Sequence, residues 1–393
     1  MTRRRHYACA VALALACSAC GGGVGASVTS SPPAPSAAAP SAAAPSCPSR
    51  IFSRMTEAQR VGQLFLVGIA GNPIAEVAQA VTTYHFGSLL FGTDTTAGVT
   101  GIRQLTRKLQ ALTSSYATAG VRFFIAANQE GGEVQNMQGP GFAQIPPALD
   151  QGQLTPGDLQ RQAADWGREL SSAGVNLNLA PVMDVVPPGT AAENQPIGAL
   201  QREFGDTPAI VADHGVAFIK GMRQAGVATT AKHFPGLGRV GGNTDFTSGV
   251  VDTVTTPDDP YLKTFQAAID AGVPLVMVAL ATYTRIDPRH LAAFSSQVMR
   301  VMLRQKMHFR GVIISDDLGV AAAVADIPPT ARGIDFLAAG GDMITSESLT
   351  VAVQMDEAIL ERAAVDPAFR AEVNSAVRYV LTAKQAYHLL PCS

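Results

Sequence analysis

The segment Gly311-Val-Ile-Ile-Ser-Asp-Asp-Leu-Gly319 decides the fold class, because an apolar run too short for a helix ends in two carboxylates. A continuous β-branched run of this length is typical of a fully buried parallel strand. In α/β barrels the catalytic residues lie where such strands end. Asp316 and Asp317 are therefore candidate active-site residues. An aspartate can also cap the helix that follows a strand, and each of the two residues can fill one role.

Apolar runs of strand length recur along the chain and predict an α/β fold. They are, in order, Val61–Ile69, Gly87–Phe91, Phe123–Ala127, Val175–Val182, Ala228–Ala231, Pro274–Leu280, Gly311–Ile314 and Asp342–Thr345. Between most of them lie helix-like stretches with apolar residues three and four positions apart, such as Gly157–Ala173 and Pro208–Ala225. Eight strands alternating with helices predict a (β/α)8 TIM barrel. The stretch 50–393 has the length of one such catalytic-type domain.

Polar residues follow several of these runs. They are Asn128, Gln129 and Glu130 after the third run, Asp184 after the fourth, Lys232 and His233 at the fifth, and Asp316 and Asp317 at the seventh. Because the parallel strands of a barrel all end at one rim, we expect these side chains to lie close together.

Composition favours an enzyme over a binder of polyanions. Hydrophobic residues make up 47% of the chain, enough for a large core, and the net charge of −2 provides no general attraction to nucleic acid. The sequence contains no Gly-x-x-x-x-Gly-Lys-Ser/Thr phosphate loop and no Cys/His spacing typical of zinc. We therefore expect no cofactor, no metal and no nucleic-acid partner.

The amino-terminal region has the pattern of an export signal followed by a spacer. Arg3, Arg4 and Arg5 precede an apolar stretch that is too short to span a membrane as a mature helix. It ends in Cys17-Ser-Ala-Cys20-Gly, which resembles a bacterial lipoprotein cleavage signal with Cys20 as the acylated residue. We therefore predict a signal peptide over 1–20, a flexible linker over 21–49, and a lipid anchor on the outer face of the cytoplasmic membrane. Plain secretion is the alternative.

Two cysteines remain once the predicted signal peptide and the lipidated residue are set aside. Cys47 and Cys392 lie at the two edges of the predicted domain. In an exported protein such a pair suggests a disulfide. Because the first and last elements of a barrel are neighbours, we expect the two to be bridged.

Five motifs occur in a characteristic order. They are Phe124-Ile-Ala-Ala-Asn-Gln-Glu-Gly-Gly132, Asn178-Leu-Ala-Pro-Val-Met-Asp184, Ile197-Gly198 with Arg202-Glu-Phe-Gly205, Lys232-His-Phe-Pro-Gly-Leu-Gly238, and Ile314-Ser-Asp-Asp-Leu318. Over roughly residues 55–385 the chain resembles the glycoside hydrolase family 3 barrel, in its single-domain bacterial β-N-acetylhexosaminidase branch. The resemblance implies retaining hydrolysis, in which a carboxylate attacks the anomeric carbon and a second group protonates the leaving oxygen.

The resemblance also implies roles for single residues. The family's nucleophile directly follows the Ser or Thr that ends the seventh strand, which implies Asp316 and leaves Asp317 to bond the following turn. The family holds sugar hydroxyl and acetamide groups with a Lys-His pair and an arginine, here Lys232, His233 and Arg202. Two extra residues precede Arg202 relative to the usual spacing, and a backbone-bonded core histidine is the alternative for His233. An ionised Asp316 requires donors, which we expect Lys232 or backbone amides to supply.

Departures from the family pattern put the acid/base in question. The resemblance implies a histidine in the loop after the fifth strand as general acid/base, oriented by an aspartate. Here Asp245 is kept, but Thr247 stands in the place of the histidine, and a hydroxyl cannot act as an acid near neutral pH. Four other changes are expected at the rim: Asn128 for a sugar-binding aspartate, Glu133 for an arginine, Leu237 for a histidine, and Leu280 for a histidine.

Three hypotheses follow for the function. The first is a hydrolase of N-acetylglucosamine-containing cell-wall glycans, with Asp316 as nucleophile and Asp245 as substitute acid. The second is a related glycosidase with a changed sugar preference, because Asn128 and Glu133 alter the groups that read hydroxyls. The third is a lipid-anchored, catalytically inactive barrel that binds a glycan or a partner. We expect a monomer in each case.

Overall fold

The structure is a computed structural model that describes residues 21–27, 46–69 and 74–392. It divides into two units, Met1–Ala44 and Pro45–Ser393, of which the second contains all the described helices and strands. In the first unit, residues 21–27 form neither helix nor strand. The predicted signal peptide over 1–20, with its lipidation site Cys20, lies outside the described residues.

Eight parallel strands close into a barrel. They are β1 (Phe65–Gly68), β2 (Ser88–Phe91), β3 (Phe124–Ala127), β6 (Leu177–Asn178), β7 (Ala228–Phe234), β9 (Leu275–Val278), β12 (Val312–Asp317) and β13 (Met343–Ser346). The strands neighbour one another in chain order, and β13 pairs with β1 to close the ring. The predicted TIM barrel is thus confirmed, and one strand overlaps each of the eight apolar runs.

Two strands differ from the predicted runs in a way that matters for the site. The first run begins at Val61, but that residue belongs to a helix and the strand starts only at Phe65. The seventh strand continues past Ile314 through the two aspartates to Asp317. Asp316 and Asp317 are consequently held in the barrel sheet, where Asp317 pairs with Thr345 of β13.

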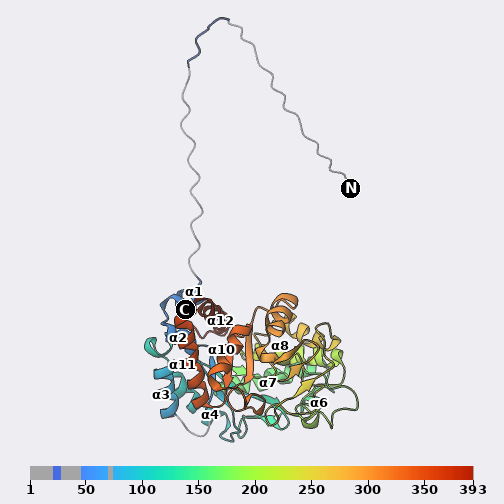
Figure 1. Cartoon of the computed structure of the whole chain (residues 1–393). Helices are drawn as coiled ribbons and strands as arrows, with labels where there is room; N and C mark the ends of the chain where they lie inside the picture. The colour runs from blue at the N-terminus through green and yellow to red at the C-terminus, as the bar shows by residue number, and fades with distance from the viewer. Residues whose placement is uncertain (1–20, 28–45, 70–73, 393) are drawn as a thin grey trace, which may run out of the picture. The chain divides into compact units, whose positions relative to one another are not determined.

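Helices surround the barrel (Figure 1). They are α1 (Cys47–Arg54), α2 (Glu57–Gly62), α3 (Ile74–Tyr84), α4 (Gly98–Gln110), α5 (Ser115–Thr118), α6 (Ala148–Gln151), α7 (Pro156–Ala173), α8 (Pro208–Gln224), α9 (Lys263–Asp270), α10 (Pro329–Ala339), α11 (Leu349–Val365) and α12 (Pro367–Ala386). Four 3-10 turns, Gly198–Leu200, Pro260–Leu262, Ala292–Phe294 and Ala322–Val324, and a π-helix, Gln297–Lys306, complete the helical structure of the described chain.

The helix α7 shows how local sequence sets these boundaries. The Thr155 hydroxyl accepts a hydrogen bond from the Asp158 backbone N–H, and Pro156 occupies the first turn, where no intrahelical donor is needed. Gly174 ends the helix with a φ of 82°, in the left-handed region that glycine adopts without steric cost. The predicted helices Gly157–Ala173 and Pro208–Ala225 agree with α7 and α8 to within one residue at each end.

Short strands outside the barrel carry the loops above its rim. The strand β4 (Gln129–Gly131) pairs with β5 (Val134–Gln135), and β10 (Thr282–Tyr283) pairs with both β8 (Val251–Asp252) and β11 (Asp287–Leu291). These pairings support the segments that follow β3, β7 and β9.

The two ends of the barrel unit are joined covalently. Cys47 and Cys392 form a disulfide between residues 345 positions apart in the chain, and α1 packs against α12 (Figure 1). Because α1 begins at Cys47, the barrel unit starts before the boundary expected at residue 50. In the part of the chain that the structure describes, no helix has the length and apolar character needed to cross a membrane.

Candidate active site

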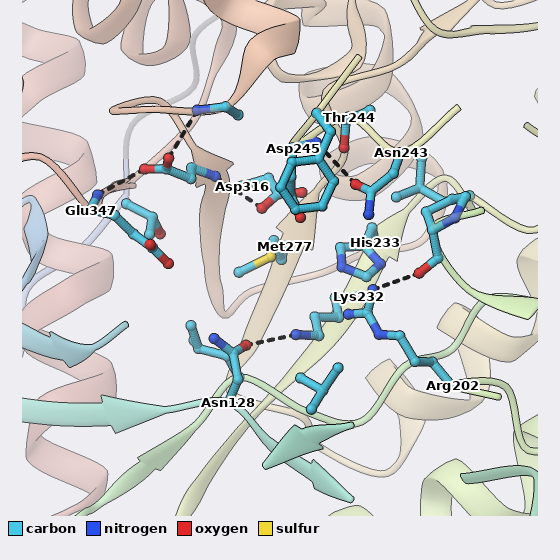
Figure 2. A pocket seen from close by; sticks show the side chains of 18 of the residues that line it. Asn128, Arg202, Lys232, His233, Asn243, Thr244, Asp245, Met277, Asp316 and Glu347 are labelled. Atoms are coloured by element: carbon cyan, nitrogen blue, oxygen red, sulfur yellow. Dashed lines mark hydrogen bonds between the residues drawn. The ribbon is translucent and has the colours of Figure 1, made fainter. Parts of the chain in front are cut away.

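A cavity of about 600 Å³ opens at the carboxyl-terminal ends of the barrel strands. Its wall contains all six side chains that the sequence indicated for catalysis and sugar binding. They are Asn128, Arg202, Lys232, His233, Asp245 and Asp316. Figure 2 shows them around one common space. This volume lies in the range of small-molecule sites, which is typically about 300–1,000 Å³.

The two aspartates of β12 have different surroundings. Asp317 is buried, and its carboxylate accepts hydrogen bonds from four backbone N–H groups, those of Gly319, Val320, Ala321 and Glu347, at 2.7–3.1 Å. Asp316 is half-buried and lines the cavity, and its Oδ1 accepts the Asp317 backbone N–H at 2.9 Å. Asp317 therefore organises the turn, while the Asp316 carboxylate is available to a ligand.

The Asp316 carboxyl is surrounded by charges of both signs. Burial raises its pKa, and the nearby Asp245 carboxylate adds to this rise. His233, Lys232 and the Asp317 N–H oppose it, because each favours the ionised form. Of the two kinds of donor expected for Asp316, the backbone amide is present. The Lys232 ammonium makes its hydrogen bonds elsewhere.

Glu130 connects the sugar-binding cations. Its Oε2 accepts the Arg202 Nε at 2.8 Å, and its Oε1 lies 2.8 Å from Arg202 Nη2 and 2.6 Å from Lys232 Nζ. Burial alone would raise the Glu130 pKa, but the two cations outweigh it and lower the pKa to about 2. Glu130 therefore stays ionised and fixes both cations in the cavity wall. Its place after the third run was visible in the sequence, but its pairing was not.

Lys232 and Arg202 retain donors for a ligand. Lys232 Nζ contacts Glu130 and donates to Asn128 Oδ1 at 2.9 Å, so one of its three N–H groups is free of these bonds. Arg202 gives three of its five N–H groups to Glu130 and to the Pro196 carbonyl. Arg202 lines the cavity despite the two additional residues before it. Burial, with help from Arg202, lowers the Lys232 pKa, although Glu130 opposes this.

His233 combines the two roles considered for it. Its Nδ1 contacts Asp184 Oδ2 at 2.8 Å, and Asp184 Oδ1 accepts the backbone N–H groups of His233 and Leu237 at 3.0 and 3.1 Å. The imidazole is therefore held by a buried carboxylate, while the ring still lines the cavity. A fixed ring with one nitrogen bonded to a carboxylate leaves the other nitrogen for a ligand.

The loop after β7 covers one side of the cavity. Thr244, Asp245 and Phe246 line it, whereas Thr247 is exposed and is not part of the lining. The Asn243 side chain accepts the Asp245 N–H at 3.0 Å, and the Asp245 carbonyl accepts the Ala322 N–H at 3.1 Å. The first bond lies within the loop, and the second ties the loop to the segment that follows β12.

The four further substitutions expected at the rim do not all lie there. Asn128 and Leu237 line the cavity, but Glu133 and Leu280 do not. Leu280 is fully buried beside β9, and Glu133 is exposed on the loop between β4 and β5. The expectation of one altered rim is therefore wrong for Glu133 and Leu280. Side chains alternate along a strand and turn away in the loops, so proximity in sequence does not place them at the cavity.

One carboxyl group in the cavity had no role in the sequence reasoning. Glu347 follows β13 directly and lines the same cavity as Asp316 (Figure 2). Partial burial and the Asp317, Asp245 and Asp316 carboxylates raise its pKa to about 7. The signal that identified the other residues, a polar side chain just after an apolar run, also applies to Glu347. Among the described residues, no three His, Cys, Asp or Glu side chains are grouped to hold a metal ion.

Known proteins are similar to this chain in both sequence and fold. Residues 56–383 match the glycosyl hydrolase family 3 N-terminal domain. The "Beta-N-acetylhexosaminidase" of Beutenbergia cavernae is a structural neighbour with a TM-score of 0.82 and 46% identity, covering 84% of this chain and 99% of that one. The "Beta-hexosaminidase" of Xylella fastidiosa (strain M23) is 33% identical over 66% of this chain and 76% of that protein. That of Stenotrophomonas maltophilia (strain R551-3) is 35% identical, with 56% of this chain and 65% of that protein covered.

A barrel rim that carries carboxylates together with N–H donors able to bind sugar oxygens is typical of a glycosidase active site. The match over 56–383 is more specific, and the chain belongs to glycosyl hydrolase family 3. The aligned part spans just under two thirds of the Stenotrophomonas protein.

Proposed function

We propose that this protein is a retaining glycoside hydrolase of the β-N-acetylhexosaminidase type, acting on glycans that contain N-acetylglucosamine. The observation that carries the proposal is the Asp316 carboxylate, which faces a cavity whose other walls carry Lys232, Arg202 and Asn128. The Beutenbergia β-N-acetylhexosaminidase and the Xylella β-hexosaminidase, to which the chain is similar, support the substrate class. Asp316 is the proposed nucleophile.

The proposed reaction takes two steps. The Asp316 carboxylate attacks the anomeric carbon and the bond to the leaving oxygen breaks. That oxygen keeps the electron pair of the broken bond and takes a proton from an acid. Water then attacks the glycosyl ester, a base takes a proton from the water, and Asp316 leaves as a carboxylate. The raised pKa of Asp316 also makes it a better nucleophile once it is ionised. His233 and Lys232 keep the ionised form accessible.

The cavity offers donors suited to one sugar ring. Lys232, Arg202 and the amide of Asn128 supply N–H groups beyond those used within the protein. Because Glu130 fixes both cations, these donors are oriented before the sugar binds. This preorganisation reduces the entropy lost on binding.

An inactive glycan-binding barrel is the second candidate. Thr247, in the place of the family's acid/base histidine, favours it. Asp245, the substitute acid proposed from the sequence, lines the cavity and counts against it. The two candidates differ in a measurable property, because only the hydrolase forms a covalent ester on Asp316.

The test uses the 2,4-dinitrophenyl β-glycoside of N-acetylglucosamine, whose leaving group needs no proton. We expect the wild-type protein to hydrolyse it with retention at the anomeric carbon, and Asp316→Asn to lose at least ~10³-fold in kcat/KM, because loss of a nucleophile cannot be offset by the remaining groups. Asp326→Asn, a change outside the cavity, is the control. Binding of the sugar without any turnover by the wild-type protein would favour the inactive barrel.

We also propose that the protein is exported and anchored through an acylated Cys20, with cell-wall glycans as its substrates. The amino-terminal pattern supports anchoring, and the Cys47–Cys392 disulfide is typical of oxidising compartments. Mass spectrometry of the membrane fraction would detect an acylated amino-terminal cysteine. An unmodified chain in the medium would contradict the anchor.

A further inference from the structure

Glu347 lies at the same rim as the proposed nucleophile and lines the same cavity. The strands β12 and β13 are hydrogen-bonded neighbours, with Asp317 paired to Thr345, and Glu347 follows two residues later. A retaining glycosidase needs two carboxyl groups at one site, about 5–5.5 Å apart. Asp316 and Glu347 line the same cavity.

The fold provides a fitted place for Glu347. A Cβ on Gly92 would lie 3.1 Å from the Glu347 Cδ, and a Cβ on Gly68 would lie 2.8 Å from its Cα. Glycine at both positions, at the ends of β1 and β2, therefore leaves room for the carboxyl group and its backbone. The Glu347 N–H donates to Asp317 Oδ1 at 2.8 Å. Because the Asp317 N–H donates to Asp316, this one aspartate positions both carboxyl-bearing residues.

The Glu347 carboxyl group is free to exchange protons. Within the described chain its oxygens accept no side-chain or backbone hydrogen bond, and the side chain remains open to the cavity mouth. It is influenced by Asp317 and Asp316 from β12, by Asp245 from the loop after β7, and by Lys232 from β7. A pKa of about 7 makes both its protonated and its ionised form available near neutral pH.

Asp245 is the competing carboxyl group, and its position differs. It lies on an exposed loop between Thr244 and Phe246, and the Phe246 side chain is 82% exposed. Glu347 is exposed as well, but it directly follows a barrel strand and its backbone N–H is bonded to Asp317. Catalytic groups carried by rigid elements hold their geometry better than groups on loops.

We propose that Glu347 is the general acid and base of the reaction. It would take the role of the family's histidine, which Thr247 replaces in this chain. This rests on the proposed retaining hydrolysis at Asp316. In the first step the Glu347 O–H gives its proton to the leaving oxygen as the glycosidic C–O bond breaks and the ester to Asp316 forms. In the second step the Glu347 carboxylate takes a proton from water, the water oxygen bonds to the anomeric carbon, and Asp316 is released.

The test compares Glu347→Gln with Asp245→Asn on two substrates. Chitobiose has a poor leaving group that needs a proton, whereas the 2,4-dinitrophenyl glycoside does not. For Glu347→Gln we expect kcat/KM on chitobiose to fall ~10²–10⁴-fold, the typical contribution of a general acid. On the dinitrophenyl glycoside kcat/KM should change less than ~10-fold. Azide, which needs no base, should accelerate turnover of the activated substrate and yield the glycosyl azide with retained configuration.

Three further measurements guard against a structural explanation. Glu133→Gln removes an exposed carboxyl group outside the cavity and should behave like the wild type. For the wild type, kcat/KM on chitobiose should fall as the pH rises through about 7, and this decline should be absent from the residual activity of Glu347→Gln. Thermal unfolding followed by circular dichroism verifies that each variant is folded.

The outcomes separate this proposal from the one it rests on. If Glu347→Gln cleaves chitobiose like the wild type while Asp245→Asn loses ~10²-fold or more, Asp245 is the acid and Glu347 is not, and the hydrolase proposal stands. If Glu347→Gln loses activity equally on both substrates, and azide restores the activity on neither, the role of Glu347 is structural. If Asp316→Asn keeps full activity, the hydrolase mechanism itself fails.

Discussion

At the scale of single residues, the site depends on a buried anion that touches no substrate. Glu130 is 4% exposed and bonds Arg202 and Lys232 together. Without it two cations would face each other inside the barrel, where like charges and missing partners are costly. The free energy of unfolding and the orientation of the sugar-binding donors therefore depend on the same carboxylate.

Replacing Glu130 by Gln should lower stability and weaken binding together. Breaking a buried ion pair by removing one partner typically costs about 3–5 kcal/mol, and we expect a loss of that order in urea unfolding at pH 7. KM should rise more than kcat falls, because Arg202 and Lys232 lose their orientation. Glu133→Gln is the matched control. Equal stability of the wild type and the Gln variant would show that the pairing contributes nothing.

The same variant has a defined pH dependence. The Glu130 pKa is lowered to about 2 in the folded protein, against about 4.3 in an unfolded chain. Its contribution to stability is thus fully present above about pH 4.3 and is lost as the pH falls toward about 2. The stability difference between the wild type and Glu130→Gln should shrink as the pH falls from about 4.3 toward about 2.

The strand-end pattern predicted most of the site residues, for a physical reason. Parallel strands all deliver their last side chains to one rim, so Asn128, Lys232 and Asp316 could be grouped without knowing any distance. The bond between Glu130 and Arg202 joins residues 72 positions apart, and no local pattern encodes such a pairing. Roles that depend on long-range partners therefore became visible only in the structure.

At the scale of elements, the barrel strands were predictable and the rim segments were not. Each barrel strand is buried on both faces, so it reads as a continuous apolar run. The strands β8, β10 and β11 lie outside the barrel, and β11 has an exposed, polar sequence from Asp287 to Leu291. Such strands form because neighbouring loops pair with them, and their own residues carry little signal.

The helix α11 carries a buried acid that the proposed reaction does not use. Asp356 is 1% exposed, and its Oδ1 has no hydrogen-bond partner among the described residues. Burial, with a smaller effect of Glu357, raises its pKa to about 8. The folded protein therefore keeps a proton that the unfolded chain releases near pH ~4, so this contribution to stability is present below pH ~4 and is lost as the pH rises through about 8.

Replacing Asp356 by Asn should remove part of the pH dependence of stability. We expect the free energy of unfolding of the variant to increase relative to that of the wild type as the pH rises from 5 to 8, by on the order of 2–4 kcal/mol at pH 8. Urea unfolding at four pH values measures the difference. Glu361→Gln, an exposed change on the same helix, should show no such trend. A pH-independent difference for Asp356→Asn would mean that this carboxyl group has an ordinary pKa.

At the scale of the whole molecule, two links join the first and last elements of the barrel unit. The strand β13 pairs with β1, and the Cys47–Cys392 disulfide joins the first helix to the carboxyl-terminal segment. That segment also contacts the start of β3, because the Leu389 carbonyl accepts the Arg122 N–H at 2.8 Å. The disulfide therefore lies toward the amino-terminal ends of the strands, whereas the cavity lies at their carboxyl ends.

This separation predicts that the disulfide contributes to stability and not to catalysis. A cross-link closing a long loop mainly restricts the unfolded chain, and removing a native disulfide typically costs about 2–4 kcal/mol. We expect Cys47→Ala with Cys392→Ala to lose that amount in guanidinium unfolding under oxidising conditions, with kcat and KM on the dinitrophenyl glycoside unchanged. Adding reductant should bring the wild type to the stability of the variant and leave the variant itself unaffected. A double variant as stable as the oxidised wild type would show that pairing of β13 with β1 holds the ends together without the cross-link.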